Sequence, residues 1–146
     1  MKSKQLVNTT GLKLWIAVLD PGDEAKTALT KFAQDMRMQS ASFVAVGAFE
    51  RVKLGYFDWE KKAYQPIPIE EQVEVISFIG DIVRDENDAP SLHAHTVVGR
   101  FDGTTRGGHF LEGIVRPTLE VTFTETPTHL VRRKQPGLNI PLIDLG

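Results

Sequence analysis

Three of the four histidines in this chain lie within residues 91–115, at spacings that suit a metal site. His93 and His95 are two residues apart, so on a β-strand both side chains leave from the same face. His109 lies further along, directly after two glycines. Three neutral imidazoles on one rigid face suit zinc or another late first-row divalent ion, and they leave one coordination position for water or a ligand. The alternative is three separate histidines, each exposed or hydrogen-bonded.

A short turn is expected between the two histidine-bearing segments. Asp102-Gly103 is a strong signal for a β-hairpin, because tight hairpin turns need positive φ angles that Gly and Asp tolerate. If the loop contains only these two residues, Phe101 pairs with Thr104. In that register His109 points away from the other two histidines.

One additional residue on the return strand changes this outcome. His109 then pairs with Val97, lies diagonal to His95 and shares its face. Either a β-bulge at Gly107-Gly108 or a three-residue loop that includes Thr104 would supply the extra residue. We therefore predict this shifted register. The predicted metal ligands are His93, His95 and His109, and the glycines that shape the site are Gly103, Gly107 and Gly108.

A metal ion held by three histidines lowers the pKa of a bound water and polarises carbonyl groups. A metal-dependent hydrolase would also need a general base close to that water. The candidate bases are Glu50, Glu112 and Glu120, although a charge on the surface or on an edge strand is the commoner role for each. Glu112 has the wrong strand parity unless a bulge follows it, and the other two reach the site only through the fold or from a neighbouring subunit. The sequence therefore assigns no catalytic residue and no reaction.

The elements that must position the histidines are one helix and several short strands. Asp23 is a plausible N-cap, and apolar residues then recur at helical spacing as far as Met36. Apolar or alternating runs predict strands at 12–19, 42–50, 52–57, 63–68, 73–79, 119–124 and 129–133, in addition to the histidine hairpin. Residues 80–90 are expected to form an acidic loop.

These elements predict an α+β fold, with one main helix packed on a largely antiparallel, twisted sheet. No linker or repeat divides the chain, so residues 1–146 are expected to form a single domain, with a core over about 10–134 and an irregular tail over 135–146. Open sheet edges invite pairing with another chain. The sequence alone does not select a trimer over a dimer.

The composition excludes several classes of protein. Seventeen basic and nineteen acidic residues give a net charge of −2, which is not the basic footprint of a nucleic-acid-binding protein. The chain has no cysteine, so any metal must be held by His, Asp or Glu. The first residues lack the apolar segment of a signal peptide, and no run is long enough to span a membrane. We expect a cytoplasmic protein.

The histidine pattern H-x-H followed by G-G-H-F resembles the prokaryotic, metal-site branch of the PPC family (plants-and-prokaryotes conserved domain). Residues 45–58, AVGAFERVKLGYFD, are similar to a strand pair of that family, and residues 74–80, EVISFIG, are similar to its central segment. The resemblance covers nearly the whole chain. It implies a compact α+β domain, a homotrimer, and a metal site formed by the hairpin histidines.

Some relatives in this family are DNA-binding proteins, which gives a competing hypothesis. Plant members carry an AT-hook, and this chain has none; Gln72 also stands where the plant branch tends to have Arg. The densest basic run, residues 132–134, would supply at most about three phosphate contacts per subunit. A third hypothesis is a ligand sensor that binds a small carboxylate or nucleotide at the metal, and no residue pattern identifies that ligand.

Overall fold

The computed structural model describes all 146 residues as one helix and nine strands joined in a single sheet. The helix α1 spans Ala25–Asp35. The strands are β1 (Lys2–Asn8), β2 (Lys13–Leu19), β3 (Ser40–Asp58), β4 (Ala63–Ile69), β5 (Val73–Asp85), β6 (Pro90–Gly99), β7 (Thr105–Thr126), β8 (Val131–Lys134) and β9 (Pro141–Asp144). All strand pairs are antiparallel except that of β5 with β8. The predicted α+β class is confirmed.

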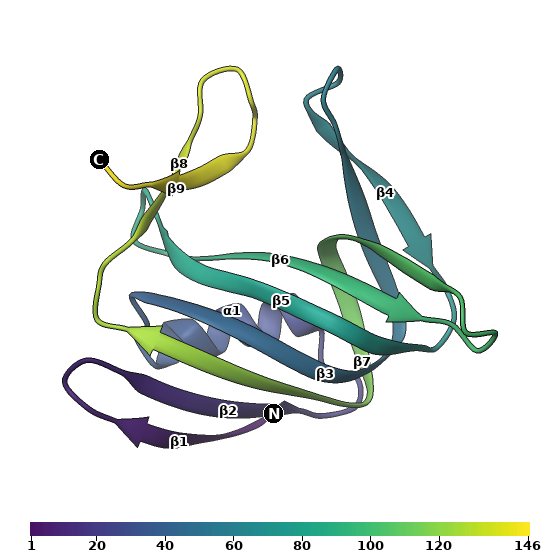
Figure 1. Ribbon diagram of the computed structural model, residues 1–146, viewed down its shortest axis with the longest axis horizontal. Coiled ribbons are helices and arrows are strands. Elements are labelled where there is room, and N and C mark those ends of the chain that lie inside the picture. The colour runs from purple at the N-terminus through teal and green to yellow at the C-terminus, as the bar shows by residue number, and fades with distance from the viewer.

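Two long strands, β3 and β7, run through the whole molecule and organise the sheet (Figure 1). They pair with each other along most of their length, with register shifts that let both strands bend. β5 pairs with β3, and β6 pairs with both β5 and β7. The strands β3, β5, β6 and β7 therefore form a closed ring of paired strands, and the histidine-bearing β6 is held on both sides.

The sequence-based prediction divided these long strands too finely. Residues 42–50 and 52–57 belong to one strand, β3, and residues 104–115 and 119–124 both fall largely within β7. Bulges bend the backbone without interrupting pairing, and a local pattern does not distinguish such a bend from a strand end. The predicted loop at 80–90 is also wrong over its first half, because β5 continues to Asp85 and only a short turn precedes β6.

The helix begins one residue later than predicted. Glu24, not Asp23, is the N-cap: its carboxylate accepts hydrogen bonds from the backbone N–H groups of Lys26 and Thr27. It also accepts one from the backbone of Gly113 in β7, at 3.2 Å. Asp23 instead accepts from the backbone N–H of Asp20 in the preceding turn. The longer Glu side chain spans the helix start and the neighbouring strand, so it ties α1 to the sheet.

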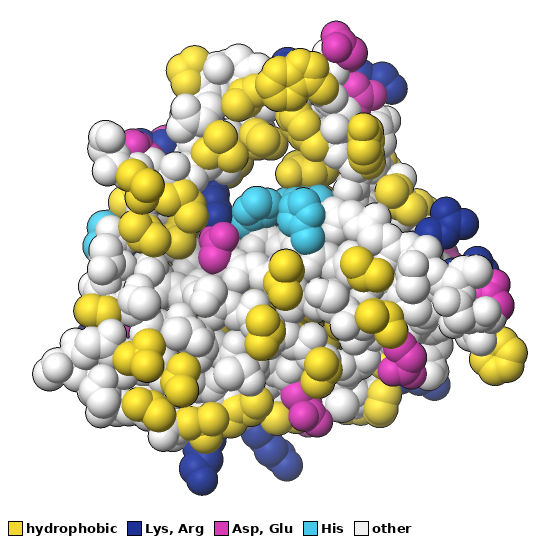
Figure 2. Space-filling view, in the orientation of Figure 1, with side chains coloured by type: hydrophobic (Ala, Val, Ile, Leu, Met, Phe, Trp, Pro, Cys, Tyr) yellow, Lys and Arg dark blue, Asp and Glu magenta, His cyan; other side chains and the backbone are white.

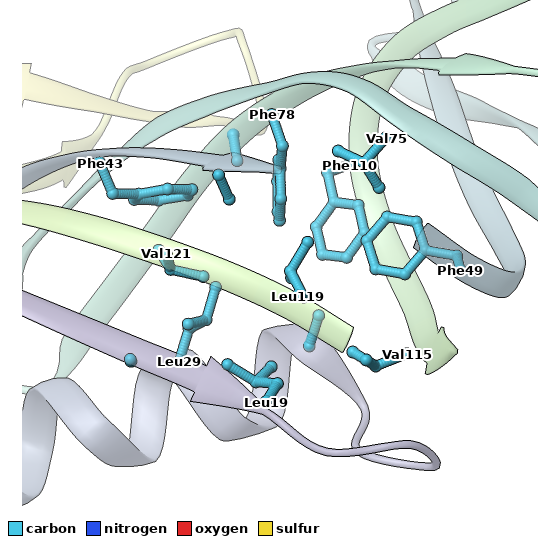
Figure 3. Close-up of a cluster of buried hydrophobic side chains, with 14 of the residues drawn as sticks. Leu19, Leu29, Phe43, Phe49, Val75, Phe78, Phe110, Val115, Leu119 and Val121 are labelled. Carbon is cyan, nitrogen blue, oxygen red and sulfur yellow. The ribbon is translucent and has the colours of Figure 1, made fainter. Parts of the chain in front are cut away.

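The core is rich in phenylalanine. Phe49, Phe78 and Phe110 are at most 1% exposed, and their ring centroids lie 4.6–6.1 Å apart (Figure 3). The helix contributes buried side chains that include Leu29 and Phe32 to the same core. Phe110 directly follows His109, so burial of this ring turns the imidazole to the opposite face of β7.

The structure contains no helix with the length and apolar composition needed to cross a membrane. Its one helix has 11 residues.

Gly80 in β5 allows the close approach of the strand that carries two of the histidines. A Cβ at this position would clash with the carbonyl oxygen of His93 and lie 2.7 Å from the Cβ of Ala94.

We expect Gly80→Ala to lower the free energy of unfolding by about 1–3 kcal/mol, because β5 and β6 must separate to accept the methyl group. Gly11→Ala is the matched control, since a methyl group at that position would have open space for 4 Å around it. Chemical denaturation of the two variants tests this, and equal stability would contradict it.

Candidate metal centre

The turn between β6 and β7 has three residues, Phe101 to Gly103. The N–H of Gly103 donates to the carbonyl of Arg100, and the N–H of Arg100 donates to the carbonyl of Thr104, both at 2.9 Å. Gly103 has a φ of 79°, which a non-glycine residue adopts only with strain. The loop therefore includes Phe101 rather than Thr104, and the prediction of a two-residue turn or of a loop containing Thr104 is wrong.

This turn sets the register of the hairpin, in which His95 pairs directly with His109. The predicted partner of His109, Val97, pairs with Gly107 instead. Because the observed and predicted registers differ by two residues, the strand parity is the same, and the prediction that all three imidazoles share one face is confirmed.

No bulge occurs at Gly107-Gly108, where the sequence analysis placed one as an option. Gly108 has a different role in the hairpin: a Cβ there would lie 2.8 Å from the carbonyl oxygen of Gly55 in β3. The missing side chain lets β3 pass close to β7 beside the cluster. His109 itself pairs with Gly55.

The three imidazoles form a compact triangle. Their ring centroids are 5.2–5.3 Å apart, and one nitrogen from each ring lies within 4.8 Å of the others. His93 and His109 are partly buried, and His95 is exposed. This spacing and donor set fit a divalent ion bound by neutral nitrogen ligands, with one side of the cluster open to a further ligand.

Tyr64 in β4 supports the cluster, and no motif in the sequence marked it as a site residue. Its hydroxyl lies 3.2 Å from Nδ1 of His109, and the two rings stack with centroids 4.2 Å apart. When Nδ1 of His109 carries the proton and donates to the hydroxyl oxygen of Tyr64, Nε2 is left to bind a metal. Burial raises the pKa of Tyr64, so its hydroxyl stays protonated. Only the pairing of β3 with β4 brings this ring to the site.

A partly buried ion pair lies beside His93. Arg132, 3% exposed, donates to Asp81 at 2.5 Å and to the carbonyl of Ser91 at 2.9 Å. Asp81 pairs with His93 across β5 and β6. Arg132 belongs to the basic run 132–134 that was considered for DNA contacts, and its burial removes it from that role. Arg133 pairs with Asp144 at 3.0 Å, which leaves Lys134 as the unpaired basic side chain of the run.

The environment keeps His93 and His109 neutral. Burial is the main cause that lowers the pKa of His93, and the charge of Arg132 adds to it. Burial also lowers the pKa of His109 to about 4, with repulsion from His93 and His95 contributing next. Neutral imidazoles are the form that binds metal ions, so the cluster is prepared for a cation near neutral pH.

The three candidate general bases lie elsewhere. Glu50 pairs with Arg51 and Arg116, and Glu112 pairs with Lys53 at 2.8 Å. Glu120 is an exposed residue of β7. None of the three lines the pocket at the histidine cluster, so within this chain they have the surface role that the sequence analysis gave as the alternative.

A pocket of about 130 Å³ opens beside the cluster. Figure 2 shows the histidines in a hollow between two projecting parts of the molecule, which Figure 1 identifies as the hairpin of β3 and β4 and the hairpin of β8 and β9. Tyr64, His93 and His109 line it from the sheet, and the C-terminal hairpin contributes Arg132, Ile140, Pro141 and Leu142. The segment 135–146, expected to be an irregular tail, thus contains a strand and covers the site.

Residues 7–127 match the Plants and Prokaryotes Conserved (PCC) domain, the family also written PPC. The chain belongs to this family. The PPC domain therefore supplies the histidine hairpin and Tyr64, whereas the C-terminal hairpin lies beyond the matched residues. No curated protein matches the chain.

Solved PPC structures share the fold over nearly the whole chain. A PPC protein from Pyrococcus horikoshii is 27% identical, with a TM-score of 0.85 over 94% of this chain and 97% of that one. A protein from Ralstonia eutropha JMP134, named "Putative DNA-binding protein", is 30% identical, with a TM-score of 0.85 over 98% and 96%. A protein from Archaeoglobus fulgidus described as metal-containing is 25% identical, with a TM-score of 0.82 over 97% and 98%.

The fold also occurs within a larger enzyme. Alpha-acetolactate decarboxylase from Bacillus subtilis strain 168 has a TM-score of 0.59 at 14% identity, over 85% of this chain and 57% of the enzyme. At this identity the similarity concerns the fold alone.

The lowered histidine pKa values predict how the stability of the metal-free PPC domain depends on pH. The unfolded chain binds protons at its histidines near pH 6.5, whereas folded His109 binds one only near pH 4. The unfolded state therefore holds more protons in this window, and the free energy of unfolding falls as the pH drops from about 6.5 towards 4.

Chemical denaturation of chelator-treated protein at a series of pH values measures this loss. His109→Gln should make the decline shallower, because the variant lacks the most strongly shifted group, and His129→Gln serves as the control outside the cluster. A pH dependence that His109→Gln leaves unchanged would contradict the prediction.

Proposed function

We propose that this protein binds a divalent metal ion, with zinc as the first candidate, through His93, His95 and His109. The observation that carries the proposal is the triangle of imidazole nitrogens, all within 4.8 Å of one another on a sheet face. A relative described as metal-containing, 25% identical over nearly the full length, supports it. The ion, when bound, would act as a Lewis acid towards a ligand in the adjoining pocket.

The surrounding residues fit this role. Tyr64 orients His109, and burial keeps His93 and His109 neutral. The open side of the cluster faces the pocket, so a small ligand or substrate can reach the ion. We further propose that the protein works in the cytoplasm and forms a homotrimer. No residue of the pocket is assigned a catalytic role.

Metal analysis of protein made without a metal-affinity tag tests the site directly. We expect elemental mass spectrometry to find about one ion per chain. The affinity for the ion should fall as the pH drops below about 6, because protons compete for the imidazoles. His95→Ala should lose the metal, since it removes the ligand paired with His109.

His129→Ala is the matched control, because His129 bonds to Gln39 at 2.7 Å and is not part of the cluster. Its metal content should equal that of the unchanged protein. Well under one ion per three chains, with no binding on titration, would refute the proposal.

The outer face of the sheet supports self-association. Val44 and Val46 in β3 and Ile76 and Ile79 in β5 are 53–61% exposed, which is unusual for a group of neighbouring aliphatic residues. Val44 pairs with Ile79, Ile79 pairs with His95, and His95 pairs with His109. The apolar face thus continues directly into the metal cluster, and subunits that cover it would bring the cluster close to an interface.

Light scattering during size-exclusion chromatography should give about three times the chain mass of 16.3 kDa. Val46→Glu combined with Ile76→Glu should yield a monomer, because the charges would be buried without partners on association. The same changes at Leu6 and Tyr56, exposed residues outside this face, should leave the mass unchanged. A monomeric unchanged protein would refute the trimer.

DNA binding is the second candidate, favoured by the name of the Ralstonia relative. The net charge of −2 and the buried Arg132 argue for weak, salt-sensitive association only. A gel-shift series with AT-rich and GC-rich duplexes separates the two candidates. We expect binding to vanish at physiological salt, and tight, sequence-dependent binding there would place DNA recognition ahead of the metal site.

A further inference from the structure

The pocket beside the histidines has two walls of different chemistry. His93, His109 and the hydroxyl of Tyr64 line the polar side together with the guanidinium of Arg132. Ile140, Pro141 and Leu142 of the C-terminal hairpin line the apolar side. No carboxylate lines the pocket; Asp81, the partner of Arg132, lies outside the lining. A ligand with an anionic end and an aliphatic end would match both walls.

We propose that this pocket binds a short aliphatic monocarboxylate, with the carboxylate at the histidines and the alkyl group against the C-terminal hairpin. The inference rests on the proposed metal site, and it names the class of ligand that the site takes. In this proposal Ile140 and Leu142, which lie beyond the residues matched by the PPC family, determine the specificity for the ligand.

Charge favours the carboxylate. Neutral imidazoles add no charge of their own, and the charge of Arg132 is balanced by Asp81, so a bound divalent ion would supply the positive charge of the polar wall. An ammonium group would be repelled from this wall. A neutral amide would forgo the charge-assisted hydrogen bonds that a carboxylate accepts from donors such as the phenol of Tyr64.

Size sets the upper limit on the ligand. A cavity of about 150 Å³ holds benzene, which has six heavy atoms. The pocket of about 130 Å³ therefore suits the four-carbon alkyl part of a short carboxylate whose charged end lies at the ion, and it is too small for a nucleotide. The hairpin limits this length, because Ile140 at the end of the loop between β8 and β9 and Leu142 in β9 both line the pocket.

Calorimetric titration of the zinc-loaded protein with three probes of one shape tests the ligand class. We expect 3-methylbutanoate to bind about tenfold or more tightly than 3-methylbutanamide, and 3-methylbutylamine to show no binding. Equal affinity for the carboxylate and the amide would overturn the proposal, as would preference for the amine.

Two substitutions near the C-terminus test the role of the hairpin. Leu142→Glu places a negative charge in the pocket, and we expect it to weaken 3-methylbutanoate binding about tenfold or more. Leu145→Glu adds the same side chain just after β9, where it neither lines the pocket nor pairs with β8, and should change the affinity by less than about twofold. Leu142 is 40% exposed and Leu145 is 84% exposed, so neither change buries a charge in the core. Equal effects of the two substitutions would overturn the assignment to the hairpin.

Metal content of each sample distinguishes this inference from the proposed function. A chain that binds no metal refutes the proposed function and the inference together. A chain that holds one ion and binds the amide as well as the carboxylate refutes the inference alone.

Discussion

The alternation of side chains along β6 and β7 is the constraint on which the site depends. Ala94, Thr96 and Val98 of β6 are at most 2% exposed, as is Phe110 of β7. Because successive side chains in a strand point to opposite faces, burial of these residues directs His93, His95 and His109 to the other face. Any slip of one residue would exchange the two sets, exposing Phe110 and burying an imidazole. The aromatic core and the candidate metal site are therefore fixed by the same pairing.

The site combines a rigid floor with walls from more peripheral elements. β6 pairs on both sides, with β5 and β7, and so holds the histidines within a closed ring of strands. Tyr64 and the C-terminal hairpin, by contrast, come from segments that project from the sheet (Figure 1). A protein built this way can keep the geometry of the histidine cluster constant while substitutions in the C-terminal hairpin change the pocket beside it. The exposed aliphatic residues of β3 and β5 border the site at His95, and a second chain packed on this face would cover them.

Several features could be predicted from local sequence because they depend on short-range physics. The spacing of His93 and His95 is enough to place them on one face of a strand, and the helical recurrence of Ala25, Leu29 and Phe32 is enough to identify α1. Asp102-Gly103 marked the turn, although the loop also takes in Phe101. The continuous β3 and β7 were not predicted, because bulges within a strand resemble strand ends in a sequence.

The residue types of the cluster, the shared strand face of His93 and His95 and the α+β class of the fold all followed from the order of amino acids. The folded chain was needed for the direct pairing of His95 with His109, the contact of Tyr64 with His109, and the burial of Arg132 against Asp81. These three features join residues that are 14, 45 and 51 positions apart. A local pattern carries information about period and turn chemistry, whereas contacts at such separations depend on how complete strands bend and pack.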